Sequence, residues 1–141
     1  MATNGTRSVT LSRLEHARFT VTNERGGSIT LGEGDTAEFT PVELLLAAVA
    51  GCSAIDVDYL TARRAQPVSF EVDVSGEKIK DESGNRLSGV EVTFRVVFPD
   101  GPDGDRARDM LPRAIQTSHD RLCTVSRTVE LPTPVTTRAA D

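Results

Sequence analysis

The strongest constraint on the fold is one long apolar segment that begins at Pro41 and reads PVELLLAAVAGCSAIDVDYLTARR. It is rich in Leu and Ala, which have high helix propensity, so it predicts a helix. Thr40 can cap its start, and Arg63 and Arg64 follow where the helix dipole favours cations. The segment is apolar on nearly every face as far as Asp56, so we expect it to be buried.

One layer of strands from a chain of 141 residues cannot cover such a helix on all sides. A second copy of the chain is the natural cover, so the pattern predicts a homodimer. Within the helix, Gly51 is expected where another backbone packs closely, and Tyr59 is expected to pack.

Alternating apolar and polar residues predict strands on both sides of this helix. Two or three antiparallel strands are expected over residues 8–31, followed by an acidic, glycine-bearing loop over 32–40. The two clearest strands contain residues 68–74 and 90–98, and the polar segment 76–89 is expected to join them as a flexible hairpin connection.

A second helix is expected over Asp105–Leu122, with a kink at Pro112. Its candidate inward positions are Met110, Ala114, Ile115 and Leu122. Val125, Val129 and Leu131 then alternate with polar residues and predict a last strand, ahead of a partly ordered tail. The element order is typical of an α+β fold, and the length predicts a single domain over 1–141 with an ordered core of about 7–135.

Charge and hydropathy exclude several functional classes. The 16 basic and 21 acidic residues give a formal net charge of −5 without a run of Lys and Arg, so nucleic-acid binding is not expected. The N-terminus has no signal-peptide pattern, and the longest apolar run, Leu44–Ala50, is too short to span a bilayer. We expect a cytoplasmic protein that does not associate with membranes.

The chain has two cysteines, Cys52 and Cys123, and thiols are kept reduced in the cytoplasm. From spacing alone they are either buried space-filling residues or a redox pair. A zinc site is not expected, because there is no Cys-x-x-Cys and the pair His119 and Cys123 offers only two ligands. No metal and no organic cofactor are predicted.

The segments TPVELLLAAVAGCSAIDV and RLCTVSRTVEL resemble the two signature segments of the OsmC/Ohr family, the osmotically inducible and organic-hydroperoxide-resistance proteins. The resemblance extends roughly from Arg7 to Val135. It implies an OsmC-like α+β fold, with antiparallel sheets around long central helices. It also implies an intertwined homodimer with two thiol sites at the subunit interface.

The resemblance further implies a thiol-dependent peroxidase that reduces organic hydroperoxides in oxidative or osmotic stress. Cys52 matches the attacking thiol, which becomes a sulfenic acid, and Cys123 matches the resolving thiol that captures it as a disulfide. A dithiol or a lipoylated protein would reopen that disulfide. The alternative is a non-catalytic OsmC-like stress protein that binds a small hydrophobic ligand in the dimer cleft, with both cysteines merely structural.

Arg18 resembles in position the arginine that activates the thiol in Ohr-type members, the alternative being an exposed arginine at a strand end. The peroxidase members carry a glutamate directly after the helix-opening proline, which holds that arginine, but this chain has Val42 there. That departure favours the less defined OsmC-like branch. The next residue, Glu43, is expected to be a cap-region acid or an interface partner.

Asp56 lies four residues after Cys52 on the same helix face, where its charge would raise the thiol pKa unless it pairs with an arginine. Alternatively, it is a buried acid paired with Arg63 or Arg64 of another helix. His119 is either a base near Cys123, through its i, i+4 spacing, or a partly exposed histidine.

Overall fold

The computed structural model describes residues 5–140. The chain forms two compact units, Met1–Leu45 and Leu46–Asp141, and in the sequence the boundary between them falls within helix α1 (Pro41–Ala62). The single domain expected from the length stays a prediction. The mixture of antiparallel strands and helices confirms the α+β class.

The first unit contains a three-stranded antiparallel sheet in the order β1 (Val9–Glu15), β2 (Arg18–Asn23) and β3 (Ser28–Leu31). The strand register sets Leu11 opposite Val21 and Val21 opposite Ile29. Because side chains alternate along a strand, apolar residues gather on one face of this sheet and threonines on the other. This sheet confirms the strands predicted between residues 8 and 31.

The start of α1 is fixed by a reciprocal cap. The Thr40 hydroxyl accepts a hydrogen bond from the Glu43 backbone N–H at 3.2 Å, and the Glu43 carboxylate accepts one from the Thr40 N–H at 2.8 Å. These two bonds satisfy backbone donors that a helix N-terminus otherwise leaves unpaired. The cap confirms the predicted helix start and shows that Glu43 is a cap-region acid.

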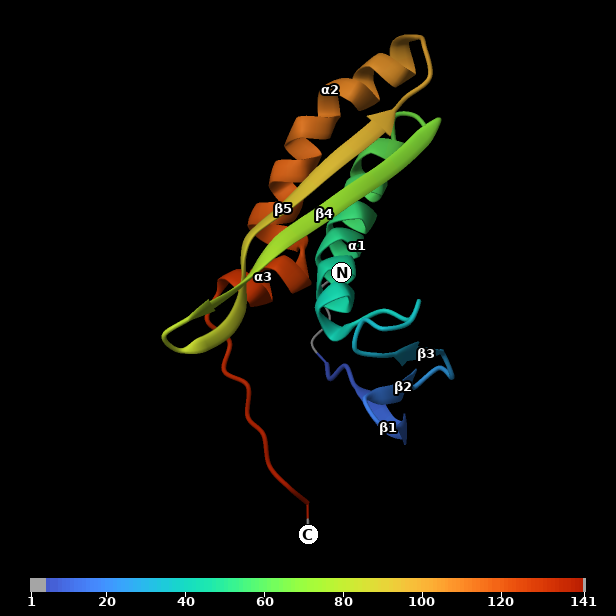
Figure 1. Ribbon diagram of the computed structural model, residues 1–141. Coiled ribbons are helices and arrows are strands. Elements are labelled where there is room, and N and C mark those ends of the chain that lie inside the picture. The colour runs from blue at the N-terminus through green and yellow to red at the C-terminus, as the bar shows by residue number, and fades with distance from the viewer. Residues whose placement is uncertain (1–4, 141) are drawn as a thin grey trace. The chain divides into compact units, whose positions relative to one another are not determined.

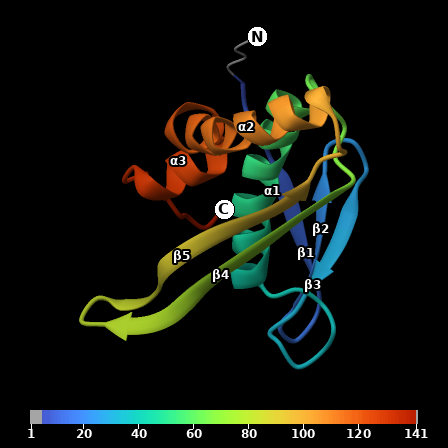
Figure 2. The same ribbon diagram turned by 90° about the horizontal axis from the view of Figure 1, so that it is seen from above.

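The second unit contains a long antiparallel hairpin of β4 (Ser69–Asp81) and β5 (Gly84–Val97), which lies across the helices in Figure 1. Phe70 and Phe94 lie on its inward face, and their rings meet edge to face with centroids 6.1 Å apart. The register departs from regular pairing between Ser75 and Glu77. In both views the hairpin tip extends past the helices (Figures 1 and 2).

The predicted flexible connection over 76–89 is wrong, because both strands continue through most of it to a tight turn at residues 82–83. The Asp81 side chain organises this turn by accepting hydrogen bonds from the backbone N–H groups of Ser83 and Gly84, at 2.8 and 3.1 Å. It also pairs with Arg86, and Gly84 adopts a positive φ of 128°. A polar composition alone does not distinguish such a paired ribbon from a loop.

Three helical segments follow: α2 (Pro102–Thr117), the π-helical turn η1 (Ser118–Leu122) and α3 (Thr124–Glu130). Along the predicted inward face of this region, Ala114 is buried, Met110 and Ile115 are half-buried, and Leu122 is exposed. α2 continues through Pro112. The helix therefore begins three residues earlier than predicted and becomes a π-turn after Thr117.

The last strand predicted through Val125, Val129 and Leu131 is wrong, because residues 124–130 form α3. Val125 and Val129 are four residues apart, and this spacing fits a helical stripe as well as it fits alternation along a strand. The backbone of Cys123, with φ −74° and ψ 99°, breaks the preceding π-turn and caps the new helix. Residues 131–140 have no regular structure and are exposed, as expected for a tail.

One face of α1 is buried within this chain and the rest is not. Its buried residues are Val49, Ala50, Ser53, Val57 and Thr61. Ile55 is 60 % exposed and Tyr59 is 71 % exposed, so this chain alone does not bury the whole helix, and the predicted burial, with Tyr59 packed, still depends on the predicted second copy. A Cβ added at Gly51 would meet nothing within 4 Å in residues 5–140, so no backbone of these residues makes the predicted close contact.

By length and composition alone, α1 would suffice to cross a bilayer, and 28 % of its most apolar window is buried within this chain. The core helix of a soluble protein has the same length and apolarity.

Candidate functional site

Two segments far apart in the sequence form a cluster of two sulfurs and a carboxylate. Cys52 and Asp56 lie one turn apart on α1, and Cys123 lies between η1 and α3. Ligand atoms of these three residues all lie within 4.8 Å of one another. Both thiols are free, Cys52 half-buried and Cys123 buried. The structure thus brings together the two cysteines singled out from the sequence.

The π-turn and α3 together fix the position of Cys123. Its backbone N–H donates to the Ser118 carbonyl at 2.9 Å, which closes the i to i−5 ring of a π-helix. The sulfur accepts a hydrogen bond from the Ser126 N–H at 3.4 Å and donates to the Ser126 hydroxyl at 3.2 Å. Cys123 is therefore a helix cap as well as a candidate redox residue.

A buried hydroxyl holds Asp56 in the cluster. The Ser118 hydroxyl donates to the Asp56 carboxylate at 2.8 Å and lies 3.2 Å from the Ser53 hydroxyl. Ser118 is fully buried. Within this chain the partner of Asp56 is Ser118, and an ion pair with Arg63 or Arg64 of another helix stays a prediction. Ser118 and Ser53 were not identified from the sequence, because isolated serines have no distinctive pattern there.

Burial raises the pKa of the Cys52 thiol above its ordinary value, because burial disfavours the thiolate. The backbone N–H of Val125 acts in the opposite direction by hydrogen bonding to the sulfur. The neighbouring Cys123 and the carboxylate of Asp56 raise the pKa further. The carboxylate of Asp56 thus acts in the expected direction, and these groups together favour the neutral Cys52 thiol.

Arg18 lies in the first unit, where it is held by two glutamates. Its guanidinium donates to the Glu38 carboxylate at 3.2 and 3.0 Å from Nε and at 2.5 Å from Nη2, and a third nitrogen donates to Glu15 at 2.5 Å. These bonds raise the pKa of Arg18, and the bond from Arg18 lowers the pKa of Glu38.

Glu38 therefore provides the carboxylate partner for Arg18 that Val42, an apolar residue, cannot provide. It stands three residues before the helix-opening Pro41 rather than directly after it. Glu38 was not identified from the sequence, because the resemblance places the carboxylate directly after the proline. Arg18 is the first residue of β2, as the alternative of a strand-end arginine expected, but its side chain is only 34 % exposed and is paired with Glu38 and Glu15.

His119 contacts carboxylates rather than the sulfur cluster. Its ring nitrogens lie 3.1 Å from Asp120 and 2.9 Å from Glu130, and its side chain is 55 % exposed. Hydrogen bonding to Asp120 and then to Glu130 raises the pKa of His119. The structure agrees with the partly exposed histidine and gives no support to a base at Cys123.

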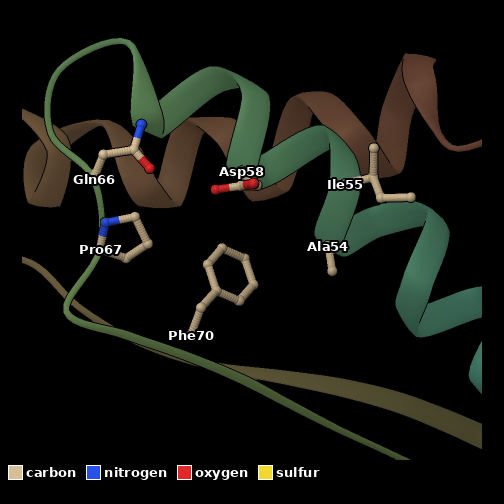
Figure 3. A pocket seen from close by; sticks show the side chains of 6 residues that line it. All are labelled: Ala54, Ile55, Asp58, Gln66, Pro67 and Phe70. Atoms are coloured by element: carbon tan, nitrogen blue, oxygen red, sulfur yellow. The ribbon is translucent and has the colours of Figure 1, made fainter.

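A cavity of about 380 Å³ opens between α1 and the start of β4 (Figure 3). Phe70 extends into it from β4, and Ala54, Ile55 and Asp58 line it from the helix. At about 100° per residue, Asp58 lies roughly 160° around the helix from Asp56. The cavity and the sulfur cluster are therefore separate features of the second unit.

The grouping of possible metal ligands differs from the one considered in the sequence. The sequence pairs Cys123 with His119, whereas the structure groups Cys123 with Cys52 and Asp56. Two thiolates and a carboxylate can act as a redox pair with a neighbouring charge, or as ligands for a thiophilic cation.

Solved structures share this fold at low sequence identity. A hypothetical protein from Aquifex aeolicus VF5 is 21 % identical, with TM-score 0.72 over 90 % of this chain and 89 % of that one. An OsmC-like protein of unknown function from Vibrio cholerae is 16 % identical, with TM-score 0.70 over 90 % and 95 %. The organic hydroperoxide resistance protein OhrB of Bacillus subtilis is 18 % identical, with TM-score 0.62 over 90 % and 92 %.

A comparison with curated proteins found no match. Residues 32–138 match the family described as OsmC-like protein, and this range contains α1, both cysteines and Asp56. The match covers most of the sequence and confirms the resemblance drawn from the two cysteine segments. The chain therefore belongs to the OsmC family.

Proposed function

We propose that this protein is a cysteine-based peroxidase that reduces organic hydroperoxides. The observation that carries the proposal is the approach of the Cys52 and Cys123 sulfurs to within 4.8 Å. A disulfide needs about 2.05 Å, which rotation about the side-chain bonds can supply from this starting distance. Membership of the OsmC family and the structural likeness to an organic hydroperoxide resistance protein support the same chemistry.

In the first step the Cys52 thiolate attacks one oxygen of the hydroperoxide. An S–O bond forms, the O–O bond breaks, and the leaving alkoxide takes a proton to become an alcohol. Cys123 then attacks the sulfenic sulfur, an S–S bond forms, and water leaves. A dithiol or a lipoylated protein reopens the disulfide by thiol–disulfide exchange. The cycle needs no resident cofactor.

Arg18 is the proposed activator of Cys52. A cation near the sulfur would offset burial and the charge of Asp56, which together raise the pKa of the thiol. Its ion pairs with Glu38 and Glu15 restrict the guanidinium, so these two glutamates are the proposed positioning residues for Arg18.

We propose that the active form is a homodimer in the cytoplasm. The exposed apolar side chains of α1, including Ile55 and Tyr59, need a cover, and a second copy of the chain can supply one. Sedimentation velocity tests this assembly. A monomer at micromolar concentration would contradict it.

The peroxidase is tested by treating the reduced protein with one equivalent of cumene hydroperoxide and measuring its mass under non-reducing conditions. The wild type should lose two hydrogens. Cys123→Ser should retain an oxygen on Cys52 that a sulfenic-acid reagent traps, and Cys52→Ser should show neither change. If both thiols survive excess peroxide, the catalytic proposal fails.

A ligand-binding protein without catalysis is the second candidate, and the cavity beside Phe70 favours it. Its volume of about 380 Å³ lies within the range of small-molecule sites, and its lining is largely apolar. Titration with a fluorescent apolar probe tests this function. Phe70→Ala should change probe affinity, whereas Cys52→Ser should leave it unchanged, because the sulfur lies on another helix face.

A further inference from the structure

The cluster of Cys52, Asp56 and Cys123 has the donor set of a metal site. Two sulfurs and a carboxylate oxygen suit a borderline-soft divalent cation such as Zn²⁺. With Zn–S bonds of about 2.3 Å and tetrahedral angles, two sulfur ligands stand roughly 3.8 Å apart. The three ligand atoms here already lie within 4.8 Å of one another, so a shift of about 1 Å would bring them to coordination distance.

The surroundings support each ligand. Cys52 and Asp56 lie one turn apart on a single helix, which fixes their spacing. The Ser118 hydroxyl donates to one Asp56 oxygen at 2.8 Å, an outer-shell contact of the kind that orients ligating carboxylates. Backbone N–H groups of Val125 and Ser126 donate to the sulfurs of Cys52 and Cys123, and such bonds stabilise thiolates.

The charges in the cluster also favour a bound cation. Two thiolates and a carboxylate at this spacing would place three negative charges in a half-buried cluster. Cys123 is fully buried, so its thiolate needs a compensating charge. A divalent cation at the centre of the three groups would neutralise them and hold both thiols deprotonated.

We propose that Cys52, Cys123 and Asp56 form a site for a thiophilic divalent cation of the Zn²⁺ class, with water as the fourth ligand. The site uses the sulfurs of the proposed peroxidase but does not depend on that activity. A bound cation occupies both sulfurs, so it protects them from peroxide and from alkylation.

The test is a titration of the fully reduced, full-length protein with Co²⁺ in the absence of peroxide. Co²⁺ bound by thiolates gives charge-transfer and visible absorption bands, and Zn²⁺ should abolish them by displacement. The wild type should bind one Co²⁺ per chain. Asp56→Asn should weaken binding by more than about tenfold, and Cys52→Ser should remove the charge-transfer band from its sulfur.

Asp58→Asn is the matched control, because Asp58 is an exposed carboxylate on the same helix and faces away from the sulfurs. It should bind Co²⁺ as the wild type does. The test substitutes Cys52 and Asp56 because their side chains are half-buried. Cys123 is buried, so its substitution could prevent folding and is not used. Absence of a thiolate band at saturating Co²⁺, or equal binding by the wild type and Cys52→Ser, overturns the proposal.

Peroxide reactivity separates this site from the enzyme. If the wild type binds Co²⁺ but cumene hydroperoxide leaves its thiols unchanged, the metal site stands and the peroxidase fails. If the thiols are oxidised at the same rate with and without saturating Zn²⁺, the metal site fails and the peroxidase stands.

Discussion

The Ser118 hydroxyl donates a 2.8 Å hydrogen bond to the Asp56 carboxylate, and so connects the turn before one cysteine to the helix that carries the other. The contact joins residues 62 positions apart in the sequence. Both cysteines therefore depend on the same buried polar contact for their mutual position.

Removing the hydroxyl of Ser118 should destabilise the fold. Ser118→Ala leaves the half-buried Asp56 carboxylate without this donor, and we expect a loss of about 1–3 kcal/mol in the free energy of unfolding. Urea unfolding measures it. The exposed strand residue Ser75 gives the control, because Ser75→Ala should change stability by less than about 0.5 kcal/mol. Equal effects of the two substitutions would show that the contact contributes nothing.

Removing the charge of Asp56 should make Cys52 more reactive. Asp56 raises the pKa of Cys52, so Asp56→Asn should increase the thiolate fraction near neutral pH. We expect iodoacetamide to alkylate Cys52 about three to ten times faster, as followed by peptide mass spectrometry with a chelator present. Asp58→Asn should leave the rate unchanged. A slower reaction in Asp56→Asn would contradict the proposed effect of the Asp56 charge on the pKa of Cys52.

The cap at the start of α1 should contribute measurably to stability. Thr40→Ala removes the hydroxyl that accepts the Glu43 N–H bond and should cost about 1 kcal/mol. Thr40→Ser keeps a hydroxyl at the same place and should retain most of that stability. Thermal unfolding of the two variants beside the wild type decides the point, and identical melting temperatures would exclude a capping role.

The contribution of His119 should depend on pH. Its pKa is raised by Asp120 and Glu130, so the folded state favours the protonated ring. This stabilisation is fully present below the unfolded-state pKa of about 6.5 and is lost as the pH rises through the raised native value. The deficit of His119→Gln in chemical denaturation should therefore be larger at about pH 5.5 than at about pH 8.5.

His16→Gln is the control for this pH dependence, because His16 lies in the first unit and takes no part in the His119 cluster. A His119→Gln deficit that grows with rising pH would have the wrong sign for the structure.

Glu38 should act on peroxide reduction through Arg18. Glu38→Gln removes the charge that orients the guanidinium, and we expect kcat/KM for cumene hydroperoxide to fall about tenfold. Glu15, with a side chain 62 % exposed against 25 % for Glu38, should matter less. Partial recovery in Glu38→Asp would distinguish a positioning role from a structural one, and an unchanged rate in Glu38→Gln would exclude it.

The sequence predicted α1, its cap and the two clearest strands, because each depends on local propensity and a regular apolar period. It also predicted the pairing of Cys52 with Cys123, through the resemblance of the two segments that carry them. Spacing alone left that pairing open.

The missed features depend on contacts that a periodicity does not encode. The Asp81 side chain organises a polar segment into a tight hairpin turn. Val125 and Val129 fit the period of a helix and the period of a strand equally well. Glu38 and Ser118 reach their partners across 20 and 62 residues of sequence. No local pattern identifies such partners.

The π-turn before Cys123 makes the spacing between α2 and that cysteine intolerant of length changes. Each helical residue rotates the chain by about 100°, so deleting one residue from Ser118–Leu122 would turn the following segment about a quarter of the way around the helix. The sulfur of Cys123 would then face away from Cys52 even though every side chain of the cluster was still present. Chains that diverge from this one can exchange residues in the turn more readily than they can gain or lose them.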